Sequence, residues 1–205
     1  MNIAVIGSGR IGAGLGRAWA RKHAVTFGAR DPGDAELREL CTATGARAAG
    51  VAAAIAGAEV VALAVPFAAL DEITRTGDFT GKIVIDCTNA VGTDRNLIFG
   101  HTTSAAEQLA AKLPGARVFK SFNAQGAENL ANPVYNGVVA DNFFCGDDAE
   151  GKKVVRQLVE DNGFEAVDAG GLAAARLLEP LMLLWIASSR SLGTRDIAFK
   201  VLRRA

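Results

Sequence analysis

The sequence has few of the features that mark specialised classes of protein. Its 205 residues contain three cysteines, two histidines and 6% aromatic residues. The cysteines (Cys41, Cys87 and Cys145) are far apart and odd in number, which argues against a disulfide framework or a zinc site and favours a reducing cytoplasm. The longest apolar run, 181–187, is far too short to span a bilayer, so we expect no membrane partner.

The charge balance excludes a further set of partners. Basic and acidic residues number 22 each, so no excess of positive charge points to nucleic acid or to an anionic membrane surface. The N-terminus "MNIAVIG" lacks the basic start of a signal peptide, which also favours a cytoplasmic protein. Half of the residues are apolar, so a chain of this length can bury a sizeable core as one domain with a small appendage.

What the sequence does contain is a regular alternation of short apolar runs and helical stretches. The runs are rich in valine and isoleucine and do not alternate with polar residues, which is typical of a parallel sheet covered on both faces. We expect strands at 3–7, 24–28, 59–65, 82–87, 117–122, 137–146 and 165–170. We expect helices at 10–22, 33–44, 50–57, 67–75, 104–113 and 148–161. The pattern predicts an α/β fold, namely a Rossmann, doubly wound, mostly parallel sheet over 1–170, followed by a C-terminal helical segment at 171–205.

Glycines cluster between the first strand and the first helix, in "VIGSGRIGAGLGRAW". Gly7, Gly9 and Gly12 form G-x-G-x-x-G at a strand-to-helix turn. Gly7 would allow the tight turn, Gly9 the approach of a pyrophosphate, and Gly12 the packing of helix on strand. The pyrophosphate would lie at the helix N-terminus. The candidate binding residues are the six consecutive residues Gly7, Ser8, Gly9, Arg10, Ile11 and Gly12; the alternative is glycine-rich packing without a ligand.

The end of the second strand distinguishes NADP from NAD. An acidic residue there usually binds the ribose of NAD, whereas this chain reads "TFGARDP". Arg30, after Ala29, lies where a 2′-phosphate would be, and a guanidinium suits phosphate geometry. Asp31 could pair with Arg30, cap the next helix or bind the ribose itself. The alternative for Arg30 is a solvated turn residue.

Three other strand ends should face the same ligand, because ligands of open α/β sheets lie at the carboxyl ends of the strands. Asparagine amides there could bind ribose or nicotinamide, or could instead tie down their own turns. The candidates at these ends are Ala64, Val65, Pro66, Asn89, Ala90, Asn123 and Ala124.

At these residues the chain resembles the NADPH-dependent reductases of the 8-hydroxy-5-deazaflavin coenzyme F-420 and the related predicted dinucleotide-binding oxidoreductases. The matching pieces are "IGSGRIGAGLGRAWA", "FGARDP", "ALAVPF", "KSFNAQGAENLANP" and "ARLLEPLMLLWIA", which cover almost the whole chain. The resemblance implies a Rossmann domain, a C-terminal helical part, usually a homodimer, and hydride transfer between NADPH and a deazaflavin ring. The chain departs from the pattern at Ala29 and Ala124, where a hydroxyl is expected, and at Arg10 and Ile11, where family members often carry smaller or acidic residues.

Taken together, these features predict an NADP(H)-dependent oxidoreductase whose second substrate is a deazaflavin or flavin-like cofactor. Hydride transfer between two cofactors needs little acid–base chemistry, so we assign no catalytic acid or base and no metal ligand. Two alternatives are a reductase of a small imine or keto substrate and a module that senses NADPH without turnover. The apolar helix "LLEPLMLLWIA" should be buried on all sides, which predicts a homodimer with Leu181, Leu184 and Trp185 near the interface.

Overall fold

The computed structural model describes residues 1–204 and contains one large sheet and a small hairpin. The large sheet has eight strands in the order β10-β9-β6-β5-β4-β1-β2-β3. These strands are β1 (Asn2–Ile6), β2 (Ala24–Ala29), β3 (Arg47–Gly50), β4 (Val60–Leu63), β5 (Ile83–Asp86), β6 (Arg117–Ser121), β9 (Asp141–Gly146) and β10 (Glu165–Asp168). The hairpin consists of β7 (Val134–Tyr135) and β8 (Val138–Val139).

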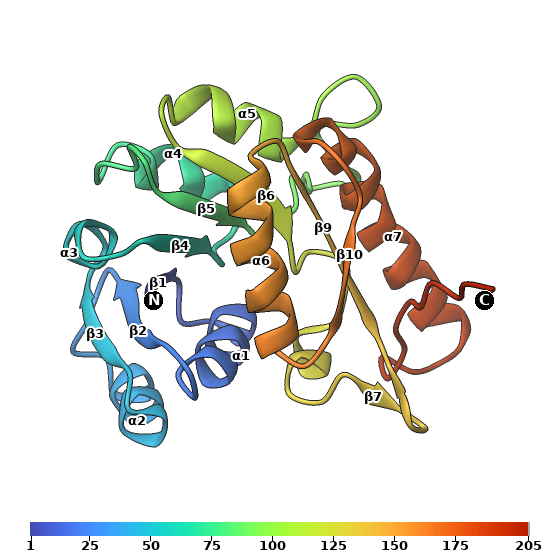
Figure 1. Cartoon of the computed structure of the whole chain (residues 1–205), viewed down its shortest axis with the longest axis horizontal. Coiled ribbons are helices and arrows are strands. Elements are labelled where there is room, and N and C mark those ends of the chain that lie inside the picture. The colour runs from blue at the N-terminus through green and yellow to red at the C-terminus, as the bar shows by residue number, and fades with distance from the viewer. Residues whose placement is uncertain (205) are drawn as a thin grey trace.

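Helices cover both faces of the large sheet (Figure 1). One face carries α1 (Arg10–Trp19), α2 (Ala35–Thr44) and α6 (Ala149–Asp161). The other face carries α3 (Val51–Ala56), α4 (Leu70–Ile73), α5 (Ala105–Lys112) and α7 (Ala175–Ser191). Three short 3-10 helices complete the order, namely η1 (Phe67–Ala69), η2 (Ala127–Leu130) and η3 (Leu172–Ala174).

The strand order confirms the predicted Rossmann fold. Strands β3-β2-β1-β4-β5-β6 are all parallel, and this is the order of the doubly wound dinucleotide-binding sheet. Strand β9 is antiparallel to β6, and β10 is parallel to β9. The order in which the chain adds strands reverses between β1 and β4, and ligands of such sheets bind at this point, outside the carboxyl ends of the strands.

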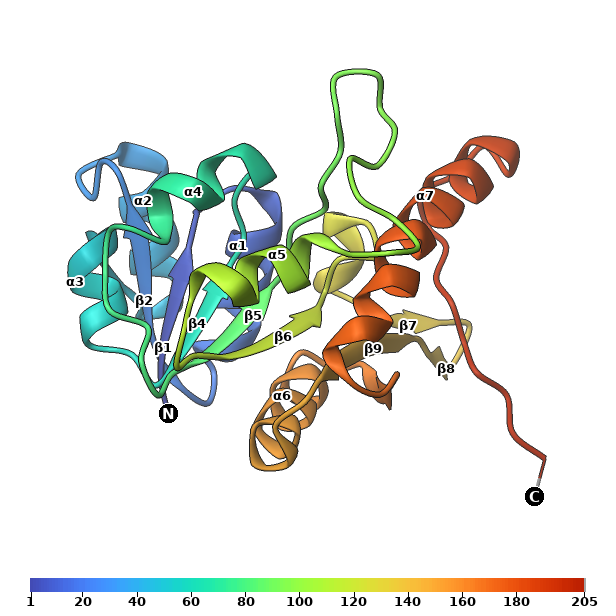
Figure 2. The same ribbon diagram turned by 90° about the horizontal axis from the view of Figure 1, so that it is seen from above.

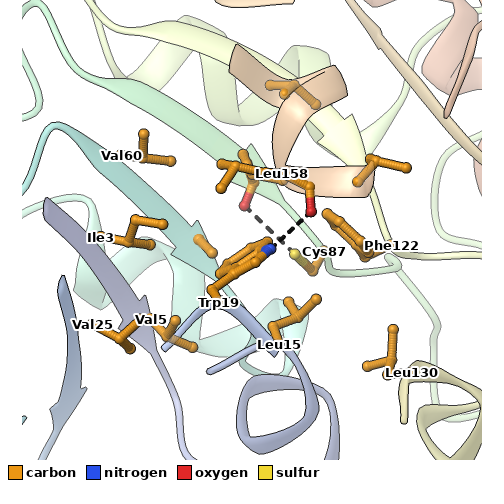
Figure 3. Packing of buried hydrophobic residues seen from close by; sticks show 14 of the residues in the cluster. Ile3, Val5, Leu15, Trp19, Val25, Val60, Cys87, Phe122, Leu130 and Leu158 are labelled. Carbon is orange, nitrogen blue, oxygen red and sulfur yellow. Dashed lines mark hydrogen bonds between the residues drawn. The ribbon is translucent and has the colours of Figure 1, made fainter. Parts of the chain in front are cut away.

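The core explains why the central strands lack a polar face. All residues of β4 and β5 are buried, because helices cover both sides of them. On the α1 face, Trp19 fills the space between α1 and α6, and its indole nitrogen donates to the Leu158 carbonyl at 2.8 Å (Figure 3). Phe122 packs edge-on against Trp19, with 5.6 Å between ring centroids. The packing therefore fixes the helix that starts at the glycine-rich loop.

Two strands differ from the sequence prediction. The short edge strand β3 was not predicted, because "RAAG" has little of the valine and isoleucine that marks strands. The strand predicted at 137–146 is interrupted at Ala140, so that β8 pairs with β7 while β9 joins the large sheet. Asn136 and Gly137 both have positive φ, as the tight turn between β7 and β8 requires.

The C-terminal segment predicted to be helical over 171–205, apart from Pro180 and Gly193, is helical only as far as Ser191 in the described residues. Gly193 has a φ of 67°, a left-handed conformation that ends helices. The residues that follow, 194–204, run without helix or strand and are held by specific bonds. The Asn129 amide donates to the carbonyls of Arg195 and Ile197, and Asp141 donates its backbone N–H to the Phe199 carbonyl.

Helix α7 has one exposed apolar face, contrary to the expectation that it is buried on all sides. Leu177 is 72% exposed and Leu184 is 54% exposed. Trp185 is buried within its own chain, donating to the Ile197 carbonyl at 2.9 Å, so it offers no surface to a partner. With η3 this segment, Leu172–Ser191, is long and apolar enough to cross a membrane by length and composition alone, although core helices of soluble proteins pass the same test.

Candidate functional site

The loop between β1 and α1 is held by two glycines that the protein itself requires. Gly7 has a φ of 101°, and its N–H donates to the Gly28 carbonyl of β2 at 3.0 Å. A Cβ on Gly7 would lie 2.5 Å from the Ala64 carbonyl oxygen at the end of β4, and a Cβ on Gly12 would overlap the Gly7 carbonyl oxygen. Both positions therefore need glycine in order to bring the loop close to the sheet.

Gly9 is different, because nothing within residues 1–204 requires glycine there. It has an ordinary extended backbone (φ −67°, ψ −174°), and a Cβ on it would meet no atom within 4 Å. Ser8, Gly9 and Arg10 are all exposed, whereas Ile11 and Gly12 turn into the fold. The first turn of α1 has neither a capping side chain nor an acidic residue, so no side chain of the described residues caps its N–H groups. The loop fits a pyrophosphate, which would fill the space above Gly9.

A pocket of about 200 Å³ lies at the carboxyl ends of β2 and β4. Its lining includes Arg30 after β2 and Val65 and Pro66 after β4. Arg30 is exposed and makes no ion pair within the described part of the chain. Ala29, before it, is partly buried against the core. The pocket has the position and size for an adenosine, with the guanidinium at its edge.

Asp31 takes neither of the two structural roles that the sequence left open for it, pairing with Arg30 or capping the next helix, and its third candidate role, binding the ribose, stays a prediction. Its carboxylate accepts from the Gly33 N–H at 2.8 Å, which fixes a local turn. Helix α2 is capped by Asp34 instead, whose carboxylate accepts from the Leu37 N–H at 3.0 Å. No ion pair joins Asp31 to Arg30 among residues 1–204. Arg30 is therefore free of its acidic neighbour.

The two candidate asparagines bind each other. The Asn89 amide donates to the Asn123 backbone carbonyl at 3.0 Å, and the Asn123 amide donates to Asn89 Oδ1 at 2.9 Å and to the Leu178 carbonyl of α7 at 2.8 Å. The pair thus joins the ends of β5 and β6 to α7, instead of tying down the asparagines' own turns as the structural alternative predicted. Asn89 remains half-buried and can still face a ligand, whereas Ala90 is fully buried and Ala124 nearly so.

A buried ionic cluster lies beneath this pair. Lys120 Nζ is 2.8 Å from Asp86 Oδ2 and 3.1 Å from Glu179 Oε1, and all three side chains are at most 1% exposed. Burial alone would lower the pKa of Lys120, but the carboxylates of Asp86 and Glu179 raise it above its ordinary value. Lys120 also donates to the Thr88 carbonyl at 2.6 Å, one residue before Asn89. The cluster therefore fixes the backbone that carries the asparagine pair.

Sequence reasoning missed this cluster, although a signal was present. Asp86 and Lys120 each stand near the end of an apolar run, and they are direct cross-strand neighbours in the parallel pair β5–β6. Glu179 had no such signal, because its partners come from distant segments. Its carboxylate accepts from the N–H groups of Ala105 and Ala106, at the start of α5.

A second pocket, of about 250 Å³, lies between α7 and the long connection from β5 to α5. This connection projects beyond the body of the protein beside α7 (Figure 2). The pocket is lined by Val91, Arg95, Leu183, Ile186, Ala187 and Arg190. It combines apolar walls with two guanidinium groups that have no ion-pair partner in the described chain. Such a lining suits an apolar ring that carries a negative group.

The proteins that this chain resembles in sequence are described as reductases or oxidoreductases. The family model described as "NADP oxidoreductase coenzyme F420-dependent" matches residues 2–90. The F420-dependent NADP reductase of Methanocaldococcus jannaschii is 31% identical over 95% of this chain and 96% of its own length. The metalloreductase STEAP3 of Rattus norvegicus is 34% identical over 64% of this chain, which spans only 27% of that relative's length.

Solved structures agree with these sequence relatives. The structure of a candidate F420-dependent NADP reductase from Arthrobacter superposes with a TM-score of 0.89 at 30% identity, covering 99% of this chain and 100% of that one. A reductive aminase from Aspergillus terreus, solved with NADPH and ethyl levulinate, gives a TM-score of 0.71 at 17% identity and is matched over 62% of its length. The latter similarity shows the shared fold alone.

Proposed function

This chain belongs to the F420-dependent NADP reductase family and is an NADP-dependent oxidoreductase; from that premise, we propose that it transfers hydride between NADPH and the deazaflavin coenzyme F-420 or a related flavin-like ring. NADPH, when bound, supplies the hydride. The protein's part is to bind both molecules, orient their rings and keep water away.

Of the cofactor-binding residues predicted from the sequence, Ala90 is fully buried and Ala124 nearly so, and we propose the binding role for the others. The observation that carries the proposal is the open space above Gly9, because the fold needs glycine at Gly7 and Gly12 but not there. Ser8, Gly9 and Arg10 would bind the pyrophosphate at the N-terminus of α1. Arg30, in the pocket formed with Val65 and Pro66, would bind the 2′-phosphate.

The nicotinamide end of the site is proposed to lie beside the asparagine pair. Asn89 is half-buried, and its position is fixed by Asn123 and by the Lys120 bond to the Thr88 carbonyl. Strands β4, β5 and β6 are parallel neighbours in the sheet, so their carboxyl ends lie side by side and form one floor. Ala64, just after β4, joins this floor to the Gly7 turn. A rigid floor of this kind would orient a ring without supplying an acid or a base.

The acceptor is proposed to bind in the pocket between α7 and the β5–α5 connection. Flavin-like cofactors combine an apolar ring with an anionic side chain, and the pocket combines Leu183 and Ile186 with Arg95 and Arg190. Val91 of its lining follows Asn89 by two residues, so the pocket adjoins the proposed nicotinamide end. Hydride transfer needs this adjacency, because the two reacting carbons must come into contact.

The proposal is tested by following NADPH absorbance with a panel of acceptors: coenzyme F-420, flavin mononucleotide and small imines. We expect oxidation with the deazaflavin. Turnover with imines alone would assign an imine reductase, and binding of NADPH without turnover of any acceptor would assign a sensor.

A substitution at Arg190 tests whether the acceptor binds in the pocket beside α7. Arg190→Gln should raise the KM for the anionic acceptor about three- to tenfold, since a hydrogen bond to a charged group is worth roughly 1.5–3 kcal/mol before solvent screening. The matched control is Arg38→Gln on α2, an exposed arginine outside both proposed sites. Equal KM values for the two variants would remove the acceptor from this pocket.

The exposed face of α7 supports a further proposal, that the protein is a homodimer. Leu177 and Leu184 are seven residues apart, so they lie on one side of the helix. Burial of this face by a second copy would remove two leucines from water at about 25 cal/mol per Å² of apolar surface. Light scattering at micromolar concentration should give a dimer, and Leu177→Glu/Leu184→Glu should give a monomer; a monomeric wild type would contradict the proposal.

A further inference from the structure

Glu128 of η2 lies between two arginines at the edge of the pyrophosphate loop. Its Oε2 is 3.4 Å from Arg10, the first residue of α1, and its Oε1 accepts from Nε of Arg195 in the C-terminal segment. The Arg10 side chain is 76% exposed, whereas Glu128 is 31% exposed. Arg195 is held firmly, because its guanidinium also stacks over Trp185 at 4.8 Å from the ring centroid.

The two ion pairs are therefore unequal. Arg195 is fixed by the tryptophan and by the Asn129 amide, which donates to its backbone carbonyl at 3.3 Å. Arg10 is tied to Glu128 by a single long bond at the rim of the open space above Gly9. The hydrogen bond from Arg195 holds the pKa of Glu128 below its ordinary value, so that the carboxylate is charged at neutral pH. Of the two arginines, Arg10 is the one that can leave.

We propose that Glu128 tunes the affinity of this protein for NADP(H) by competing with the cofactor's pyrophosphate for Arg10. In the free protein Arg10 is partly neutralised by Glu128. When the cofactor binds over Gly9, Arg10 turns to the pyrophosphate, and Glu128 keeps Arg195 as its partner. Glu128 also opposes the cofactor directly, because its negative charge lies near the phosphates. The inference rests on the proposed placement of the pyrophosphate and is independent of which acceptor the enzyme uses.

If Glu128 competes in this way, two substitutions in the same network should change NADPH affinity in opposite directions. Glu128→Gln removes the competing charge and should tighten NADPH binding about two- to fivefold at low salt, the range that exposed ion pairs provide. Arg195→Gln removes the second partner of Glu128, so that the Glu128 carboxylate pairs with Arg10 only. This substitution should weaken NADPH binding by a similar factor. A role confined to anchoring the C-terminal segment would give no such reversal of sign.

The test is a fluorescence titration of the whole chain with NADPH, without any acceptor, at two ionic strengths. The effect of Glu128→Gln should fall by about half or more in an Arg10→Gln background, because the competition acts mainly through Arg10. Both effects should shrink as salt rises. The matched control is Glu107→Gln, which breaks a comparable carboxylate–arginine pair with Arg176, 2.6 Å long, outside the loop.

Each outcome decides the proposal. Tighter binding for Glu128→Gln that falls by about half or more in the Arg10→Gln background supports the proposal, and tighter binding that falls by less than half in that background overturns it. Weaker or unchanged binding for Glu128→Gln overturns it, as does an equal effect of Glu107→Gln. If Glu128→Gln proves unstable, Glu128→Asp provides a second measurement, since the shorter side chain should release the distant Arg10 before it releases Arg195 and should also tighten binding. Failure of all variants to bind NADPH while wild type binds would also overturn it; a wild type that does not bind NADPH would contradict the proposed function itself.

Discussion

The two ends of the candidate site are built in different ways. At the proposed pyrophosphate end, the loop after β1 contains no charged group before Arg10, and its shape depends on the missing Cβ atoms of Gly7 and Gly12. At the proposed nicotinamide end, the ends of β5 and β6 are held by Lys120, Asp86 and Glu179, three charges that are almost completely buried. One end is shaped by close backbone contact, and the other by buried electrostatics.

The difference has a consequence for how each end responds to change. A glycine-lined loop loses ligand when a side chain enters the open space, but it need not lose stability. A buried ionic cluster is intolerant of losing one member, because the remaining charges have no water around them. Substitutions that fill the open space of the glycine loop should therefore change cofactor affinity without changing the stability of the fold, whereas substitutions in the buried ionic cluster should change both.

The largest expected effect is at the buried cluster. Lys120→Met leaves Asp86 and Glu179 facing each other without a cation, which should lower the free energy of unfolding by about 3–5 kcal/mol. The measurement is denaturant unfolding followed by circular dichroism. The matched variant Lys120→Met/Asp86→Asn/Glu179→Gln removes all three charges and should recover much of the loss. A loss below about 1 kcal/mol for the single variant would show that the cluster contributes little.

The next effect separates binding from stability at the glycine loop. Gly9→Val should abolish NADPH binding, by at least about a hundredfold or roughly 2.8 kcal/mol, while changing stability little, because a Cβ there meets no protein atom within 4 Å. Gly12→Ala should lose stability as well, by about 1–3 kcal/mol or more, because its Cβ overlaps the Gly7 carbonyl. Fluorescence titration and thermal unfolding of both variants test this. Normal NADPH binding by Gly9→Val would refute the placement of the pyrophosphate.

A smaller effect concerns the choice of cofactor. Arg30→Ser should remove most of the preference for NADPH over NADH, which we expect to be about tenfold or roughly 1.4 kcal/mol, and should leave NADH binding nearly unchanged. Because Arg30 is exposed, the preference should also fall as ionic strength rises. Titration of both proteins with both cofactors at two salt concentrations measures it. Equal affinity of wild type for the two cofactors would make Arg30 a solvated turn residue.

The smallest expected effect is at the half-exposed ion pair between Arg176 and Glu107, which we compare with the buried cluster of Lys120, Asp86 and Glu179. Hydrogen bonds from Arg176 lower the pKa of Glu107 below its ordinary value of 4.5. A lowered carboxyl pKa stabilises the fold above the ordinary pKa, and this contribution is lost as the pH falls through the folded-state pKa. Arg176→Gln should therefore lower the stability of the fold only slightly at pH 7, because solvent screens this half-exposed ion pair. The difference from wild type should shrink as the pH falls below 4.5 and vanish once Glu107 is protonated in the folded protein, as urea unfolding at neutral and acidic pH would show; a cost that persists in acid would have another origin.

Much of the fold could be predicted from the sequence, because its signals are local. Apolar runs such as 82–87 and the helices between them imply a covered parallel sheet, and the spacing of Gly7, Gly9 and Gly12 implies a strand-to-helix turn that approaches a ligand. Arg30 was also predictable, since its position depends only on the end of β2. In each case the residues that decide the feature are neighbours in the chain.

The tertiary structure alone decided which charges meet. Lys120 and Glu179 are 59 positions apart, and Glu128 and Arg195 are 67 apart, so no spacing rule brings them together. The same holds for the course of residues 194–204, whose composition does not show that Asn129 and Asp141 would hold them in an extended path. Local sequence sets backbone preference and burial, but the pairing of distant polar groups depends on how packed helices and strands place them, and that is a property of the completed fold.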